Sequence, residues 1–210
     1  VFDIEIDTKN IDEFIETVKN ISPTFGGINL EDIKAPEAFE IERRLVDELD
    51  IPVMHDDQHG TAIISGAALI NALELANKKI GEIQMVICGA GAAAISCAKM
   101  YKSLGVKKKN MLMFDSKGLI NVNRKDLSSE KKLFASKNVE IESLADAING
   151  SDVFIGLSKA DMMSKEMLLS MNKNPIVFAM ANPDPEINYK VALRTRDDII
   201  TVSYTHLRAH

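Results

Sequence analysis

Hydrophobic residues recur with a helical period in the first part of the chain. Residues 10–20 carry apolar side chains at positions 11, 14, 15 and 18 and acids in the first turn, which predicts a helix. A second helix is expected over APEAFEIERRLVDEL, because proline at position 36 is favoured in a first helical turn. IPVMHDD is a short strand candidate. GTAIISGAALINALELANK is predicted to form a long helix that is buried on most sides.

From residue 84 onward, short apolar runs alternate with helical patterns. The predicted strands are QMVICGAG, NMLMFD, SDVFIGLS and PIVFAMAN, and the helices between them are AAAISCAKMYKSLG, DLSSEKKLFASK, SLADAING and KEMLLSMN. Apolar strands separated by helices indicate a parallel sheet that is covered on both faces. The expected fold class is therefore α/β, with a doubly wound, Rossmann-like parallel sheet.

Composition and charge narrow the possible partners. The 210 residues carry a net charge of −6, and the one dense basic piece, KKKN at 107–110, is short, so nucleic acid is not an expected partner. No apolar run approaches the roughly 20 residues of a membrane span, and no signal peptide opens the chain, so we expect a cytoplasmic protein without a membrane segment. Cys88 and Cys97 lack metal-type spacing and are expected to be buried, reduced thiols.

Both ends of the chain depart from the pattern of an intact domain. The first residues begin in mid-strand without a methionine. At the other end, VSYTHLRAH directly follows a good strand candidate but itself has neither a helical nor a strand period. Residues 201–210 are therefore expected to be a non-native tail, and the chain is expected to be a fragment.

The segment CGAGAAA (88–94) matches the dinucleotide-binding pattern G-x-G-x-x-A between a predicted strand and a predicted helix. Gly89 would allow the tight turn, Gly91 the approach of a pyrophosphate, and Ala94 close packing of helix on strand. Asp115 ends the next strand about 20 residues later, where an acid is expected to accept a hydrogen bond from a ribose 2′-hydroxyl. The alternative is a glycine turn that only tightens the unit, with Asp115 as a cap.

Further positions belong to the same expected cofactor site. Ser116 and Lys117, directly behind that acid, would instead meet a 2′-phosphate, so the residues leave both NAD and NADP open. Ser158 in GLS and Asn182 in ANPDPE close two other strands, and ligands of open α/β sheets bind outside those carboxyl ends. Pro183 biases Asn182 toward extended backbone, which would aim its amide into the crevice; an ordinary Asn-Pro turn is the alternative.

Two acid pairs lie next to apolar stretches: Glu31 and Asp32 in NLEDIK, and Asp56 and Asp57 in MHDDQH. Elsewhere the acids are dispersed among lysines, as on a solvated surface. Three carboxylates from two strand ends would suit Mg²⁺ or Mn²⁺, which take hard oxygen ligands and keep positions for water or substrate.

Two other interpretations of MHDDQH stay open. His55, Asp57 and His59 alternate on one side of an extended strand and would suit zinc or iron. Alternatively, Asp57 or Thr61 caps the helix that follows, which leaves the second aspartate and the NLEDIK acids unexplained.

Four blocks of the sequence resemble malic enzymes, in particular their bacterial NADP-type branch. They are TFGGINLEDIKAPEAFEIE, PVMHDDQHGTAIISGAALINAL, VICGAGAAAISCAK and FAMANPDPEI, in the family's order and spacing. The resemblance runs from about Val1 to Ile200; its LEDIK and HDDQHGTA blocks are highly specific, whereas the glycine motif is shared with many dehydrogenases. It implies that residues 1–59 are the end of an N-terminal malic domain with its metal-ligand loops, and that residues 60–200 are an NAD(P)-binding Rossmann domain.

The resemblance also implies an activity, namely metal-dependent oxidative decarboxylation of (S)-malate to pyruvate and CO₂ with NADP or NAD. The residues it assigns are Glu31, Asp32 and Asp57 to Mg²⁺ or Mn²⁺ with Asp56 in support, Gly89, Gly91 and Ala94 to the pyrophosphate, and Asn182 to malate. A homo-oligomer, a dimer or larger, is the family's habit.

The chain departs from the family in its acid–base residues. The family's general base, a lysine, and its proton donor, a tyrosine, lie upstream of this segment, and Lys34 does not occupy the base position. We therefore expect no catalytic acid or base in this chain and no activity from it alone. The alternative functions are a non-catalytic dinucleotide-binding module or another dehydrogenase, such as one resembling the amino-acid dehydrogenases.

Overall fold

The computed structural model describes residues 1–34 and 36–203, and of Asp57 the backbone alone. The chain divides into two compact units, Val1–Gly60 and Thr61–His210. Each unit has its own hydrophobic core.

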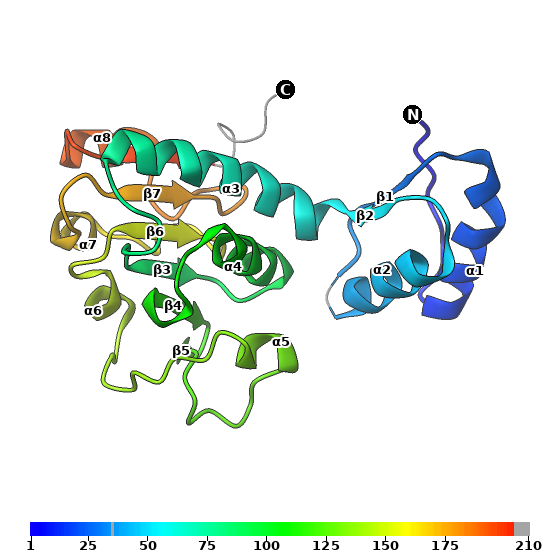
Figure 1. Ribbon diagram of the computed structural model, residues 1–210, viewed down its shortest axis with the longest axis horizontal. Coiled ribbons are helices and arrows are strands. Elements are labelled where there is room, and N and C mark those ends of the chain that lie inside the picture. The colour runs from blue at the N-terminus through cyan, green and yellow to red at the C-terminus, as the bar shows by residue number, and fades with distance from the viewer. Residues whose placement is uncertain (35, 204–210) are drawn as a thin grey trace. The chain divides into compact units, whose positions relative to one another are not determined.

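In the first unit, helices pack on a small parallel sheet (Figure 1). Its elements are α1 (Ile11–Ile21), the 3₁₀ helix η1 (Ser22–Thr24), β1 (Ile28–Leu30), α2 (Glu37–Glu48) and β2 (Val53–His55). The side chain of Asn10 caps α1 by accepting hydrogen bonds from the backbone N–H groups of Asp12 and Glu13, which have no partner within the helix. Both helices expected in this region are confirmed, and their apolar faces meet β1 in one core.

Helix α3 (Asp56–Ala76) begins earlier than expected. The sequence predicts a strand through IPVMHDD and a helix from Gly60 and Thr61, whereas β2 ends at His55 and Asp56 is already helical. Acidic side chains are favoured in the first turn of a helix, where free N–H groups and the helix dipole attract negative charge. Thr61 lies inside the helix, so the interpretation of this residue as the cap is wrong.

The expectation that α3 is buried on most sides is also wrong. Leu69 and Leu73 enter the core of the second unit, but Ile70 is half exposed and Leu75 is 76% exposed. The helix belongs to an outer layer, so the sheet covers only one of its faces in this chain.

Within residues 61–203 the strands form one sheet in the order β5-β4-β3-β6-β7-β8. The strands are β3 (Met85–Cys88), β4 (Met111–Asp115), β5 (Gly118–Leu119), β6 (Val153–Gly156), β7 (Ile176–Ala179) and β8 (Ile200–Ser203). Neighbouring strands are parallel except for β5, which is antiparallel to β4 at the edge.

Helices cover both faces of this sheet (Figure 1). The covering helices besides α3 are α4 (Ala92–Leu104), α6 (Leu144–Ile148), α7 (Lys165–Ser170) and α8 (Tyr189–Thr195). The short helices η2 (Lys108–Asn110) and α5 (Ser129–Lys132) contribute no buried residue. In β3, Met85 and Ile87 pack in the cluster with α3 and α4, whereas Val86 and Cys88 pack with α6, α7 and α8. This alternation follows from the two-residue period of a strand. The expected α/β fold with a doubly wound parallel sheet is confirmed.

The central strands are apolar on both faces, as burial under two helical layers requires. Phe154 and Phe178 are fully buried on opposite faces of the sheet, in neighbouring strands β6 and β7. Each such side chain contributes on the order of 1.5–3 kcal/mol to the stability of the fold.

The helix expected over DLSSEKKLFASK is shorter than predicted. Ser128 caps α5 by accepting a hydrogen bond from the N–H of Lys131, but the helix ends at Lys132. The chain then turns so that Phe134 enters the core and Ser136 forms an isolated parallel β-bridge with Asn121. Burial of the phenylalanine therefore outweighs the helical preference of this segment.

Helix α8 was not expected from the sequence, whereas a strand candidate directly before VSYTHLRAH marks the place where β8 begins. Helix α8 covers the sheet next to α7, and β8 adds a parallel strand to β7 in the register Ile176 to Ile200. Residues 201–203, which we assigned to the tail, therefore belong to the sheet, and residues 204–210 lie outside the described residues. Among the helices formed by the described residues, none combines the length and apolar character that crossing a bilayer requires.

Candidate functional site

The carboxyl ends of β3 and β6 meet where the strand order reverses. The chain runs from β3 outward to β4 and then returns to place β6 on the other side of β3. The Leu157 N–H, after β6, donates a hydrogen bond to the Cys88 carbonyl at 2.8 Å, so the two strand ends are joined directly. Open α/β sheets bind ligands at such a switch point.

The glycine motif leads from β3 into α4 at this point. Gly89 has φ 127°, a conformation that disfavours other residues, and a Cβ there would collide with the Leu157 carbonyl. Gly91 is the N-cap of α4, so no side chain occupies the backbone N–H groups of the first turn. The space where a Cβ would stand is open. Ala94 is buried between α4 and the sheet. The geometry thus combines a tight turn, an open backbone at a helix N-terminus and close helix–strand packing.

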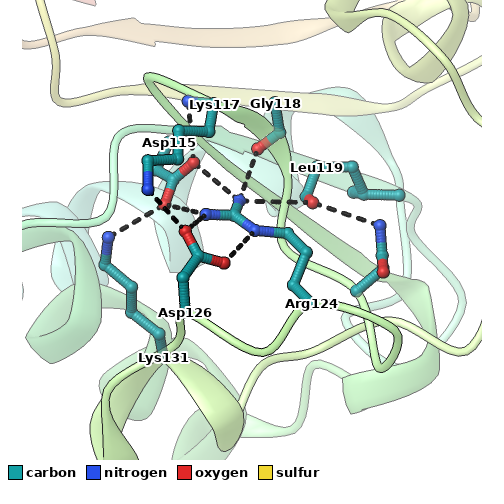
Figure 2. A network of polar contacts seen from close by, with 8 residues as sticks. Asp115, Lys117, Gly118, Leu119, Arg124, Asp126 and Lys131 are labelled. Carbon is teal, nitrogen blue, oxygen red and sulfur yellow. Dashed lines mark hydrogen bonds and ion pairs between the residues drawn. The ribbon is translucent and has the colours of Figure 1, made fainter.

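Asp115 at the end of β4 is the centre of an ion-pair network (Figure 2). Arg124 Nη1 and Nη2 donate to its Oδ1 and Oδ2 at 2.7 and 3.0 Å, and Lys131 Nζ donates to Oδ2 at 2.9 Å. The Lys117 backbone N–H donates to Oδ1 at 3.0 Å. Arg124 also pairs with Asp126, whose Oδ2 accepts a hydrogen bond from Lys117 Nζ at 2.8 Å. The cluster contains three cations and two carboxylates.

The carboxylate of Asp115 has no capacity left for another donor. Its two oxygens accept four hydrogen bonds, which is about the number of lone-pair sites that a carboxylate offers. Burial acts to raise the pKa of Asp115, which is 9% exposed, but the hydrogen bonds from Arg124 and Lys131 outweigh it and lower the pKa to about 2. Arg124, Lys131 and Asp126 were not identified from the sequence; Ser116 is exposed beside them.

The low pKa of Asp115 predicts an acid-dependent contribution to stability. Its value falls from 3.8 to about 2 on folding, so the ionised form stabilises the fold above pH 4 by up to about 2 kcal/mol. That contribution is lost as the pH falls from about 4 to 2. In urea titrations, Asp115→Asn should lower the free energy of unfolding at pH 7, and the two proteins should converge toward pH 2. An equal difference at every pH would contradict this prediction.

The loops after β6 and β7 carry the other expected residues of this crevice. Ser158 is exposed; its backbone N–H donates to Glu186 Oε1 at 2.9 Å, and its Oγ lies 3.3 Å from Cys88 Sγ. Asn182 is exposed, the Asn182–Pro183 peptide bond is cis, and the preceding Ala181 N–H donates to Glu186 Oε2 at 3.1 Å. Burial raises the pKa of Glu186, a residue that the sequence did not single out.

The two acid pairs of the first unit follow neighbouring parallel strands. Leu30 of β1 pairs with His55 of β2, so the residues that come next, the two acid pairs, lie at the same end of the sheet. Glu31 and Asp32 are exposed; Glu31 Oε2 accepts a hydrogen bond from the Asn29 side chain at 2.9 Å, and Asp32 has φ 56°. The side chain of the third expected ligand, Asp57, lies outside the described residues.

The side chain of Asp56, the residue before Asp57, lies against its own helix. The carboxylate of Asp56 occupies the space that a Cβ of Gly60 would fill, one turn along α3. Gly60 is therefore the residue that lets this carboxylate lie against the helix, rather than the start of the helix.

The histidines do not form a zinc or iron site with the described side chains. His59 Nε2 lies 2.9 Å from Glu42 Oε1, which also accepts a hydrogen bond from the His55 backbone N–H at 2.8 Å. The His55 ring is fully buried and finds no hydrogen-bond partner among the described residues. Among these residues, no group of three or more histidine, cysteine or acidic side chains has a metal-binding arrangement.

Comparison with known proteins matches nearly the whole chain to one family. Residues 58–203 match the family model described as "Malic enzyme, NAD binding domain", and residues 4–46 match "Malic enzyme, N-terminal domain". The NADP-dependent malic enzyme of Halomonas elongata is 50% identical over 198 residues, which cover 94% of this chain and 47% of that protein. The NAD-dependent malic enzyme of Rhizobium meliloti is 49% identical over 198 residues, covering 94% of this chain and 26% of that protein.

A solved structure gives the same result at the level of the fold. The crystal structure of the NAD-dependent malic enzyme of Thermotoga maritima superimposes with a TM-score of 0.87 at 39% identity, covering 95% of this chain and 54% of that one. The chain spans about half of the Halomonas protein and about a quarter of the Rhizobium one.

Proposed function

Because this chain belongs to the malic enzyme family, we propose that it forms the cofactor-binding and metal-binding parts of an enzyme that oxidatively decarboxylates (S)-malate to pyruvate and CO₂. The observation that carries the proposal is the position of the family's NAD-binding domain, residues 58–203. This region contains the switch point at which the glycine loop and the loops with Ser158 and Asn182 come together.

Malate-dependent reduction of NADP or NAD by the full-length protein that contains this chain tests the proposal. We expect turnover that requires Mg²⁺ or Mn²⁺ and releases one CO₂ per reduced nicotinamide. Binding of the dinucleotide without turnover of malate would instead favour a non-catalytic dinucleotide-binding module.

Each part of the crevice has a distinct task in this proposal. The open backbone N–H groups at the N-terminus of α4, after Gly91, hold the pyrophosphate, and Gly89 and Ala94 keep that helix against the sheet. Ser158 lines the cofactor from the end of β6, and the Asn182 amide donates a hydrogen bond to malate beside the nicotinamide. The cofactor supplies the hydride acceptor.

Glu31, Asp32 and Asp57 are our proposed ligands for Mg²⁺ or Mn²⁺. Support comes from the parallel register of β1 and β2, which brings the backbone of both acid pairs to one end of the sheet. Carboxylate oxygens are also the ligands that these hard cations prefer. Asp56, held against Gly60, would balance charge beside the site. A bound cation supplies Lewis-acid stabilisation of negative charge on the substrate oxygens.

NADP is our proposed cofactor in preference to NAD. Asp115 is already saturated by donors, so it is not available for a ribose 2′-hydroxyl, the contact expected for NAD. The Lys117 side chain is 67% exposed and, with Lys131 and Arg124, gives the cluster a net positive charge suited to a 2′-phosphate. Ser116 lies between Asp115 and Lys117 and adds a hydroxyl donor. In this proposal Asp115 binds the cofactor indirectly, by orienting the cations.

The two glycines of the motif should respond differently to substitution by alanine. Gly89→Ala places a Cβ against the Leu157 carbonyl at a positive φ and should lower the free energy of unfolding by about 2–4 kcal/mol. Gly91→Ala meets open space at φ −80°, so it should change stability by less than about 1 kcal/mol. Its methyl group should nevertheless weaken dinucleotide binding about 10-fold or more, because it occupies the approach of the pyrophosphate. Urea unfolding and calorimetric titration with NADP measure both effects, and Gly91→Ala with unchanged affinity would contradict the assignment.

A cytoplasmic location and a homo-oligomer, a dimer or larger, complete the proposal. Both rest on the resemblance to bacterial malic enzymes, and sedimentation of the full-length protein tests the second.

A further inference from the structure

Glu186 is a buried carboxylate that the proposed reaction does not use. Glu186 is fully buried, with 0% of its surface exposed, and it follows β7 in the segment ANPDPE. The two oxygens accept separate backbone hydrogen bonds, from the N–H of Ser158 at 2.9 Å and of Ala181 at 3.1 Å. Its own carbonyl accepts the N–H of Met163 at 3.0 Å, which fixes the backbone around it. A buried carboxylate is costly unless such bonds compensate it, so its burial at this point of the fold indicates a specific role.

The bonds of Glu186 join the two loops that carry proposed ligand contacts. Ser158 follows β6, and Ala181 directly precedes Asn182 after β7, so a single side chain sets the spacing between these strand ends. The β6 end is joined in turn to the glycine loop through the bond from the Leu157 N–H to the Cys88 carbonyl. The carboxylate is therefore connected to both the proposed cofactor side and the proposed substrate side of the crevice.

The absence of a Cβ at Gly156 leaves room for the carboxylate of Glu186. Gly156 is the last residue of β6, is buried, and has no positive φ, so its backbone does not require glycine. A Cβ at this position would instead collide with the carboxyl group of Glu186. Glycine inside a strand is unfavourable unless something approaches closely, and here the approaching group is Glu186.

We propose that Glu186 is a positioning residue that holds the Ser158 and Asn182 loops at the spacing needed to bind the nicotinamide cofactor and malate together. The part of this inference that concerns malate binding rests on the proposed function. The part that concerns the cofactor requires only that the chain binds a dinucleotide.

Glu186→Gln in the full-length protein is the first test. An amide offers one oxygen in place of two, so one of the two backbone N–H groups loses its acceptor and faces the amide NH₂. We expect kcat/KM for malate to fall by about 10- to 100-fold, since displacement of a binding group by about 1 Å costs up to about 100-fold. The fall should be mainly in KM, because Asn182 contacts the substrate. The Kd for NADP should also rise, by about 3- to 10-fold.

Asp152 provides a matched control at the opposite end of the same strand. It precedes β6, and its carboxylate also accepts a backbone hydrogen bond, from the Gln84 N–H at 2.8 Å, together with one from Lys78 Nζ at 2.6 Å. Asp152→Asn should therefore lower the thermal unfolding temperature. It should leave KM for malate and Kd for NADP within about twofold of wild type, because the amino ends of the strands lie away from the crevice.

Gly156→Ala is a second route to the same displacement. It keeps the carboxylate but pushes it aside, so it should reproduce the rise in KM and Kd even if Glu186→Gln fails to fold. In a Glu186→Ala background the added methyl group has room, and the effect of Gly156→Ala should be smaller than in wild type.

The outcomes separate the inference from the proposed function. Lower thermal stability with unchanged KM and Kd in Glu186→Gln or Gly156→Ala, as in Asp152→Asn, would overturn the positioning role. Wild-type protein that binds NADP but does not oxidise malate would remove the proposed function, and the NADP titrations would still test the positioning role.

Discussion

Replacement of Asp57 by alanine should lower the affinity of the full-length protein for Mn²⁺ by at least about 100-fold, with a matching loss of malate turnover at limiting metal. The reason is the small size of the proposed ligand set, in which each carboxylate supplies a large share of the charge that holds the cation. Even the partners that only orient metal ligands are worth about 10- to 100-fold in affinity, so loss of a ligand should exceed that range. Titration with Mn²⁺, followed by the electron paramagnetic resonance of the free ion, measures the effect directly.

A graded set of variants distinguishes a ligand from a nearby charge. Asp56→Asn should weaken Mn²⁺ binding by only about 10- to 100-fold, because we assign this residue to charge balance and orientation. Asp47→Ala removes the same charge from an exposed position on α2, where the side chain pairs with Arg43, and should leave the affinity within about twofold. Equal losses in all three variants would mean that net charge, and not coordination, attracts the metal. Wild-type affinity in Asp57→Ala would remove this residue from the ligand set.

The elements that could be predicted from the sequence are those with a clear period and local stop signals. β3 is a continuous apolar run, and α4 between Gly91 and Gly105 is closed by a glycine at φ 121°. Helix α5 was overestimated because burial of Phe134 is a tertiary effect that the local pattern does not contain. Strand β5 has two residues and is defined by its partner β4, so it has no period of its own.

The residues of the candidate site also differ in whether local sequence spacing identifies them. Gly89, Gly91 and Asp115 stand in one βαβ motif whose spacing is local, so the sequence identified them as candidates. Glu186 is buried by contacts 28 residues away in sequence, with Ser158, and its role depends on how β6 and β7 are paired. Arg124 lies nine residues after Asp115 in an irregular segment, where spacing alone does not predict an ion pair.

Arg124 should also decide the preference between the two dinucleotides. Arg124→Met keeps much of the side-chain volume but removes both hydrogen bonds to Asp115. The carboxylate then has lone pairs free for a ribose 2′-hydroxyl, while the cluster loses one positive charge. We expect the Kd for NADP to rise by about 10-fold, or about 1.4 kcal/mol, because the 2′-phosphate loses a neighbouring positive charge, and the Kd for NAD to fall or stay unchanged. Calorimetric titration of wild type and variant with both dinucleotides measures the ratio.

Variants of two lysines distinguish direct contact with the 2′-phosphate from a general effect of positive charge. Lys117→Ala removes the exposed ammonium group beside Asp126 and should weaken NADP binding about 10-fold without changing NAD binding. Lys109→Ala removes the same charge from η2, which precedes β4 and so lies at the other end of that strand, and should change neither. Added salt should reduce the effect of Lys117→Ala, because exposed charges are screened. If Lys117→Ala weakens both dinucleotides equally, the cluster does not read the 2′-phosphate, and wild-type protein that prefers NAD would reverse the assignment of the cofactor.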